Sequence, residues 1–293
     1  MIPTNMLRLS LLPALALSLA VVHAAPVFTE SFNSDTPGVL VTGSSSTKWN
    51  SPGTGSNVID DNSTLFTRVT TDTGNLFGQG TGNQYLRIAD TSNANNALNY
   101  NLVIKDTTIG QVGTLAFNFY DPSGDSAQGN GWLLRLGTSA GNSTTAFGLY
   151  LMNGQLRVAT TNNVEPNSTA FATYALDTAH SLVIYFNSSS SAVSYGEHTL
   201  AANTMDVWLN GSIAATALAR SGGSTGDQTI DSFGFTRKVS SNTSSDFVGT
   251  LLVDDLNAYS GVELSAIPEP ASFAMLGGIG ALVCALTLRR RAK

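Results

Sequence analysis

The chain of 293 residues carries a formal net charge of −6, and only 12% of its residues are charged. Because nucleic acid and anionic membrane surfaces repel an acidic protein, neither is an expected partner. The single cysteine, Cys284, excludes an intrachain disulfide.

The first 24 residues have the layout of a secretory signal peptide. Arg8 precedes an apolar run over residues 9–22, and Val22-His23-Ala24 supplies a small-x-small cleavage pattern. We therefore expect recognition by signal peptidase, cleavage after Ala24 and export. Without this segment and the C-terminal tail described below, residues 25–266 form a body of about 240 residues, which is enough for one substantial core.

The body consists of short β-rich runs separated by Gly, Asn, Ser and Asp, without sustained helical periodicity. The runs are 27–32, 65–70, 85–89, 98–104, 114–120, 132–136, 147–151, 156–159, 182–186, 205–209, 230–235 and 251–259. Leu115, Phe117 and Phe119 alternate with smaller residues, so their strand is expected to turn one aromatic face toward a core. The pattern predicts an all-β, antiparallel β-sandwich, with a jelly roll as the favoured form.

Two hairpins are predicted from their turns. Asn153-Gly154 joins the runs 147–152 and 156–159, and Asn210-Gly211 joins 205–209 to 213–218. Asn-Gly tolerates the two positive φ angles of a type I′ turn, whose twist suits antiparallel strands.

A hydrolase-like motif and two histidines are the candidate catalytic or metal-binding groups of the body. Gly222-Gly223-Ser224-Thr225-Gly226 matches the G-x-S-x-G string of a nucleophile elbow, but no helical pattern and no histidine follow it. We interpret it as a turn. His180 opens a strand and His198 lies in a polar loop, which predicts solvated positions for both.

Glycan-active enzymes of β-sandwich type use paired carboxylates, often at two-residue spacing along one strand. The Glu-x-Asp-x-x-Glu pattern of such glucanases is absent, and the consecutive Asp254 and Asp255 would point to opposite faces of a strand. The sequence therefore predicts a protein that is not an enzyme. A sugar would instead bind an exposed aromatic ring, and Trp49, the only tryptophan outside a clear strand, is the candidate ligand residue.

The order of elements resembles the concanavalin A-like (laminin G-like) jelly rolls. The resemblance is carried by Phe28-Thr29-Glu30-Ser31-Phe32, His180-Ser181-Leu182-Val183-Ile184-Tyr185-Phe186, Asp206-Val207-Trp208-Leu209-Asn210-Gly211 and Leu252-Val253-Asp254-Asp255-Leu256. It implies that the first and last strands lie adjacent and that Glu30 with Asp254 or Asp255 holds a structural Ca²⁺, a cation that prefers oxygen ligands. The alternative is that these residues bond backbone groups in turns.

The C-terminus, residues 267–293, has three blocks in a fixed order. Pro268-Glu269-Pro270 precedes an uncharged apolar run over residues 271–288, and Arg289-Arg290-Arg291 follows it. At about 1.5 Å per residue, this run reaches about 27 Å and predicts a single transmembrane helix. The basic end would stay on the cytoplasmic side, which places the body outside.

This tail resembles the PEP-CTERM sorting domain of Gram-negative bacteria that make exopolysaccharide. The resemblance implies an exosortase as a partner, transient anchoring in the inner membrane, and delivery to the cell surface or extracellular matrix. The expected role is binding or structuring exopolysaccharide. The alternatives are a structural surface-coat protein without a ligand and a divergent glycan hydrolase or lyase.

Overall fold

The structure is a computed structural model. It describes residues 25–38, 49–50, 65–90, 101–104, 108–123, 131–139, 141–160, 166–224, 226–238 and 249–267. The expected signal peptide, the Pro-Glu-Pro motif, the transmembrane run and the basic end lie outside these residues.

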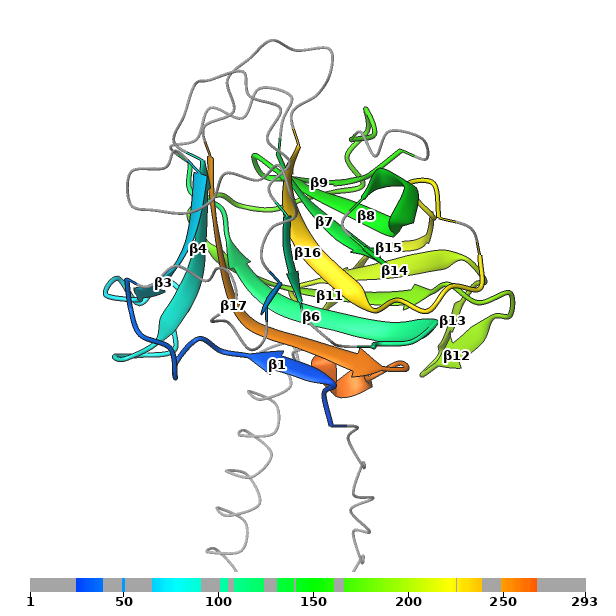
Figure 1. Cartoon of the computed structure of the whole chain (residues 1–293), viewed down its shortest axis with the longest axis horizontal. Coiled ribbons are helices and arrows are strands. Elements are labelled where there is room, and N and C mark those ends of the chain that lie inside the picture. The colour runs from blue at the N-terminus through cyan, green and yellow to red at the C-terminus, as the bar shows by residue number, and fades with distance from the viewer. Residues whose placement is uncertain are drawn as a thin grey trace, which may run out of the picture.

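Two antiparallel sheets are packed as the layers of a β-sandwich (Figure 1). The larger has eight strands, in the order β15 (Ser212–Ala219), β14 (Thr204–Leu209), β11 (Ala179–Asn187), β6 (Val112–Tyr120), β17 (Gly249–Ser260), β4 (Gln84–Asp90) and β3 (Leu65–Thr71), with β1 (Phe28–Glu30) also on β17. The smaller has seven, in the order β10 (Ala172–Thr173), β9 (Gln155–Val158), β8 (Thr145–Met152), β7 (Gly131–Gly137), β16 (Ser232–Lys238), β5 (Asn101–Ile104) and β2 (Trp49–Asn50). The all-β, antiparallel prediction is confirmed.

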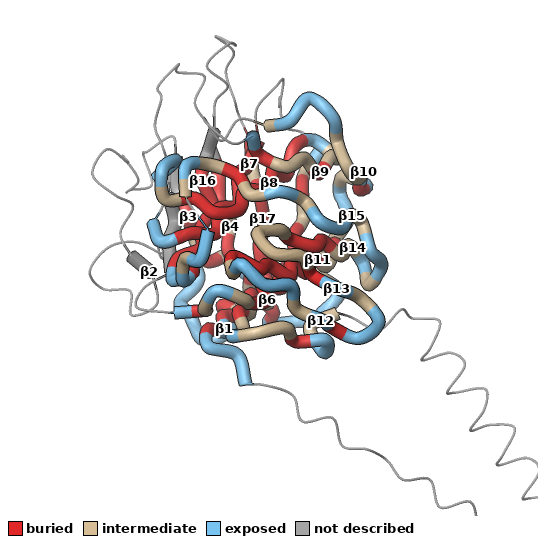
Figure 2. Tube along the Cα trace, turned by 90° about the vertical axis from the view of Figure 1, so that its right-hand side faces the viewer, coloured by how far each residue is buried: buried red, intermediate tan, exposed pale blue. Residues whose placement is uncertain are grey.

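The main core lies between the two sheets, where Figure 2 shows a largely buried interior. Phe117 of β6 meets Phe235 of β16 edge to face, with ring centroids 5.6 Å apart. Phe147 of β8 lies 6.0 Å from Phe186 of β11. The alternation expected around Phe117 is therefore correct, because aromatic rings from facing sheets fill one apolar layer.

The outer face of the eight-stranded sheet is covered by two short elements. The hairpin of β12 (Val193–Tyr195) and β13 (His198–Leu200) places Tyr195 and Leu200 in a second apolar cluster with Tyr185. Beside it, the 3₁₀ helix η3 (Leu264–Ala266) brings Ala266 and Ile267 onto the same cluster. The chain is thus packed on this sheet up to the last described residue.

Both predicted Asn-Gly turns are present. Asn153 and Gly154 have φ angles of 44° and 78°, and Asn210 and Gly211 have 52° and 74°. They join β8 to β9 and β14 to β15 as antiparallel neighbours. The pair of positive φ angles explains both turns, since Asn and Gly adopt this region at the lowest cost.

The first and last strands of the body are adjacent, as expected. Glu30 of β1 pairs with Leu256 of β17. β17 pairs with β4 up to Val253, and its pairing with β6 shifts between Asp254 and Asn257. The extra residue forms a β-bulge with Asp255 at a φ of 49°. The bulge therefore lies where β17 changes its neighbour from β4 to β1.

Candidate functional site

The two sheets differ in the sign of their charged residues. Among the strands that the structure describes, those of the seven-stranded sheet contain no Asp or Glu. Their charged residues are Arg135, Arg157, Arg237 and Lys238. The charged residues in the strands of the eight-stranded sheet are Glu30, Asp90, Asp206, Asp254, Asp255, Arg68 and Arg87. An acidic protein thus has one sheet whose strand charges are all positive, which favours anions near that layer.

Arg135 lies near the centre of this sheet on its outer face. Its neighbours in β7, Leu134 and Leu136, belong to the main core, so Arg135 points the other way. Across the sheet it pairs with Gly234 of β16 and Gly148 of β8. One glycine on either side leaves the long side chain room to lie along the sheet.

The Arg135 guanidinium is buried among neutral acceptors. Only 3% of the residue is exposed. Its Nε donates to Thr236 Oγ1 at 3.0 Å, and its Nη1 donates to Asn142 Oδ1 at 2.8 Å and Thr145 Oγ1 at 3.1 Å. Burial lowers the pKa of Arg135 to about 10, so the group stays charged at neutral pH. A buried cation without a carboxylate partner is costly, and this arrangement requires an explanation.

The second terminal nitrogen of Arg135 is the open part of the group. Nη2 has no hydrogen-bond acceptor among the described residues. Nη2 is also not among the described side-chain nitrogens that are shielded from solvent and lack a hydrogen-bond partner. An anion could therefore approach Arg135 at Nη2 without displacing an existing hydrogen bond.

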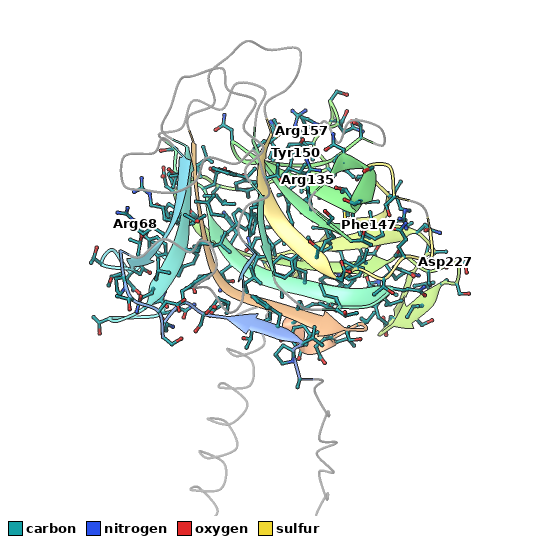
Figure 3. The ribbon with its side chains drawn as sticks, in the orientation of Figure 1. Arg68, Arg135, Phe147, Tyr150, Arg157 and Asp227 are labelled. Atoms are coloured by element: carbon teal, nitrogen blue, oxygen red, sulfur yellow. The ribbon has the colours of Figure 1, made fainter. Side chains whose placement is uncertain are left out.

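The strand register places Arg157 and Tyr150 on the same face as Arg135, and Figure 3 labels the three residues. Tyr150 is fully buried. Tyr150 of β8 is directly opposite Arg157 of β9 in the antiparallel register. The Arg157 guanidinium donates to Gln155 Oε1 at 2.6 and 3.0 Å and to the carbonyl oxygens of Asn167 and Ser168 at 2.8 and 2.6 Å. All of these acceptors are neutral, so they orient the positive charge without cancelling it.

The sequence carries a signal for this site that strand patterning alone does not reveal. Arg135 interrupts the apolar run of β7, where Trp132, Leu133, Leu134 and Leu136 are all buried. A charged residue is almost never fully buried unless it is paired. An arginine inside a strand of this kind therefore indicates either a buried partner or a ligand.

The expected calcium residues Asp254 and Asp255 lie at the β17 bulge and accept hydrogen bonds from amides. Asp254 is fully buried, and its Oδ2 accepts from Asn83 Nδ2 at 2.9 Å. Asp255 Oδ2 accepts from Asn118 Nδ2 at 2.9 Å, and also from Gln79 Nε2. The bulge turns both carboxylates toward polar side chains, although two consecutive residues of a regular strand would point to opposite faces.

Glu30, the third expected calcium ligand, is also buried, with 4% of it exposed. Its Oε1 accepts from the backbone N–H of Phe32 at 3.0 Å, in a turn where Phe32 has a φ of 60°. Within the described part of the chain, no group of three His, Cys, Asp or Glu residues is arranged to hold a metal ion. A calcium ion held by Glu30 with Asp254 or Asp255 stays a prediction, since such a pair falls below that number and Ca²⁺ also accepts carbonyl and amide oxygens.

The histidine prediction is wrong for His180. This residue is only 7% exposed, because its ring lies against Phe119 and Tyr174, with centroids 5.4 and 5.5 Å away. Its Nε2 contacts the carbonyl oxygen of Ala175 at 2.8 Å, and its Nδ1 contacts Asn210 Nδ2 at 2.9 Å. With both ring nitrogens engaged, the imidazole is held in the fold rather than presented to a substrate.

Ser224, the serine of the G-x-S-x-G string, bonds Arg220 and Gln228. Its Oγ accepts from Arg220 Nη2 at 2.9 Å and donates to Gln228 Oε1 at 2.5 Å. These contacts fasten the segment after β15 and agree with the prediction of a turn.

Trp49, the predicted sugar contact, lies in β2 at one edge of the seven-stranded sheet. Its backbone is therefore in the same sheet as Arg135 and Arg157. Its side chain, like the sorting motif Pro268-Glu269-Pro270 and the basic residues Arg289, Arg290 and Arg291, lies outside the described residues. Within the described ranges, no helix has the length and apolar character needed to cross a membrane.

No protein-family model and no curated protein sequence match the chain. Among solved structures, a carbohydrate esterase from the Shiga toxin-encoding bacteriophage phi24B is 13% identical, with a TM-score of 0.42 over 68% of this chain and 89% of that one. Alginate lyase Aly36B is 13% identical, with a TM-score of 0.39 over 61% and 82%. Trypanosoma rangeli sialidase is 13% identical, with a TM-score of 0.39 over 69% and 28%. At these TM-scores the likeness carries no activity or substrate over to this chain.

Proposed function

We propose that this protein is an exported, non-enzymatic polysaccharide-binding β-sandwich that acts at the cell surface or in the extracellular matrix. Its sandwich is a jelly roll of concanavalin A-like form, and the outer face of the seven-stranded sheet is the binding face. The signal peptide and the PEP-CTERM-like tail direct its export, membrane anchoring and processing by an exosortase.

One observation supports the assignment of the binding face to the seven-stranded sheet. Arg135, Tyr150 and Arg157 lie together on one face of a sheet whose described strands contain no acidic residue. Guanidinium groups donate several hydrogen bonds in a fixed planar geometry, which suits the hydroxyl-rich edges of sugar rings. Tyr150 is fully buried and contributes packing beneath this face rather than a contact surface. Trp49 at the edge of the same sheet would extend the surface.

The test is binding of the purified full-length protein to a glycan array and to the exopolysaccharide of the producing cell. We expect saturable binding that Trp49→Ala weakens. Trp208→Phe, in β14 of the other sheet, is the matched control and should bind like the wild type. Failure to bind any glycan would contradict the proposal.

A structural surface-coat role is the second candidate, and β15 favours it. This edge strand of eight residues, Ser212–Ala219, contains no charged residue and is partly or fully exposed throughout. An uncharged exposed edge can pair with another strand. Concentration-dependent assembly in the absence of glycan, abolished by Thr216→Lys, would support this role.

A further inference from the structure

The buried charge of Arg135 calls for a partner that the described protein does not supply. The nearest groups to its guanidinium are two hydroxyls and an amide oxygen, which share its hydrogen atoms but leave its charge uncancelled. Arg157 repeats this arrangement, with one amide oxygen and two backbone carbonyls. Two such cations on one face would repel each other less if an anion bound near both.

A neutral sugar would not make full use of this face. Hydroxyl groups can accept hydrogen bonds from Arg135 Nη2, but Thr236 and Thr145 already provide acceptors of that type. An oxyanion differs because it adds opposite charge, and hydrogen bonds between ionised partners are about twice as strong as neutral ones. The gain is larger in a partly buried site, where water screens the attraction less.

We propose that the ligand of the seven-stranded face is an acidic polysaccharide, with an oxyanion group of the glycan bound at Arg135 Nη2 and its chain passing Arg157. This inference rests on the proposed function and assigns the charge of its ligand. Tyr150, which lies opposite Arg157 in the register, is fully buried in a cluster with Leu133, so the two guanidinium groups rather than this ring would hold the glycan. Uronic acids and sulfated sugars both carry an oxyanion group, so either kind of glycan would supply the group bound at Arg135.

The distribution of acidic residues supports the same assignment. A polyanion would be repelled by the eight-stranded sheet, whose strands hold five acidic and two basic residues, Glu30, Asp90, Asp206, Asp254, Asp255, Arg68 and Arg87. It would meet only cations along the strands of the seven-stranded sheet. The charge pattern therefore selects both the ligand and the side of the molecule on which it binds.

The experiment measures binding of full-length protein to three soluble glycans of similar length: polygalacturonate, dextran sulfate and neutral dextran. Salt is varied in each titration. We expect an acidic glycan to bind at least about tenfold more tightly than dextran, with an affinity that falls steadily as salt rises, because charge pairs are screened. The two acidic arms distinguish a carboxylate from a sulfate as the bound group.

Charge variants locate the site. Arg157→Gln and Arg135→Gln should each weaken acidic-glycan binding about tenfold or more, whereas Arg135→Lys, which keeps the charge, should lose less than Arg135→Gln. Arg87→Gln, in β4 of the other sheet, removes the same charge and is the matched control. Circular dichroism identifies any variant that fails to fold, and Arg157→Gln tests the site independently of the buried position.

Each of the other possible results of these binding measurements would contradict one specific part of the two proposals. Equal, salt-insensitive binding of all three glycans would refute the acidic ligand and leave the proposed function intact. A loss with Arg87→Gln equal to that with Arg157→Gln would refute the assigned face. Binding of none of the three, nor of any glycan on the array, would refute both proposals.

Discussion

Asp254 is the residue at which charge and burial conflict most clearly. Burial raises its pKa to about 6, and the charges of Asp255 and Asp72 add to the rise, while a hydrogen bond from Asn83 opposes it. The folded state therefore binds this proton more tightly than the unfolded chain does. By linkage, its ionisation above that pKa costs stability, and protonation at lower pH restores it.

Replacing Asp254 with Asn should flatten this dependence. When the pH is lowered from about 7 to about 4, the free energy of unfolding of the wild type should rise relative to that of Asp254→Asn by on the order of 1 kcal/mol. Asn83 can accommodate the new amide, since its own Oδ1 is buried and without a hydrogen-bond partner among the described residues. Urea titrations across this range measure the difference. A parallel shift of the two curves at all pH values would contradict the assignment.

Asp206 joins two elements through one buried carboxylate. Its Oδ2 accepts from Tyr195 Oη at 2.6 Å, and its Oδ1 accepts from the backbone N–H of Ala217 at 2.7 Å. Asp206→Ala removes both acceptors and should lower the free energy of unfolding by about 2–4 kcal/mol. Tyr195→Phe removes one donor and should cost about 1 kcal/mol. Equal losses in chemical denaturation would show that the Ala217 contact contributes nothing.

At the scale of elements, the β8–β9 hairpin depends on Gly154. Its φ is 78°, and an added Cβ would lie 3.1 Å from the carbonyl oxygen of Tyr174. Gly154→Ala should therefore cost about 2 kcal/mol, from backbone strain and crowding together. Gly78→Ala is the matched control, because Gly78 has a φ of 71° but no atom within 4 Å of the added Cβ. Its cost should be about 1 kcal/mol, and thermal unfolding compares the two.

Elements with a local signature were predictable from the sequence, and those set by sheet order were not. The aromatic alternation around Phe117 and the Asn153-Gly154 turn identify a core strand and a hairpin without knowledge of the rest. The placement of Arg135 between Gly148 and Gly234 depends on pairing between strands distant in the sequence. The burial of His180 has the same origin, because β11 pairs with β6 and so places the His180 ring against Phe119.

At the scale of the whole molecule, the last described turn closes one side of the sandwich. Glu263 donates its backbone N–H to Thr114 Oγ1 at 2.9 Å, and its carbonyl oxygen accepts from Tyr185 Oη at 3.2 Å. A body that ends at Gly261 should lose about 2 kcal/mol relative to one that ends at Ile267, because the cluster under η3 becomes exposed. Calorimetry of the two bodies tests this, and identical melting temperatures would contradict it.

The position of η3 bears on which way the molecule would face if a surface held its C-terminal end. Ala266 and Ile267 pack on the outer side of the eight-stranded sheet, so the described chain ends on this layer. β1 leaves from the same sheet. A surface holding the protein through its C-terminus would lie beneath this layer. The layer with Arg135 and Arg157 would then be turned outward, toward the polymers that surround the cell.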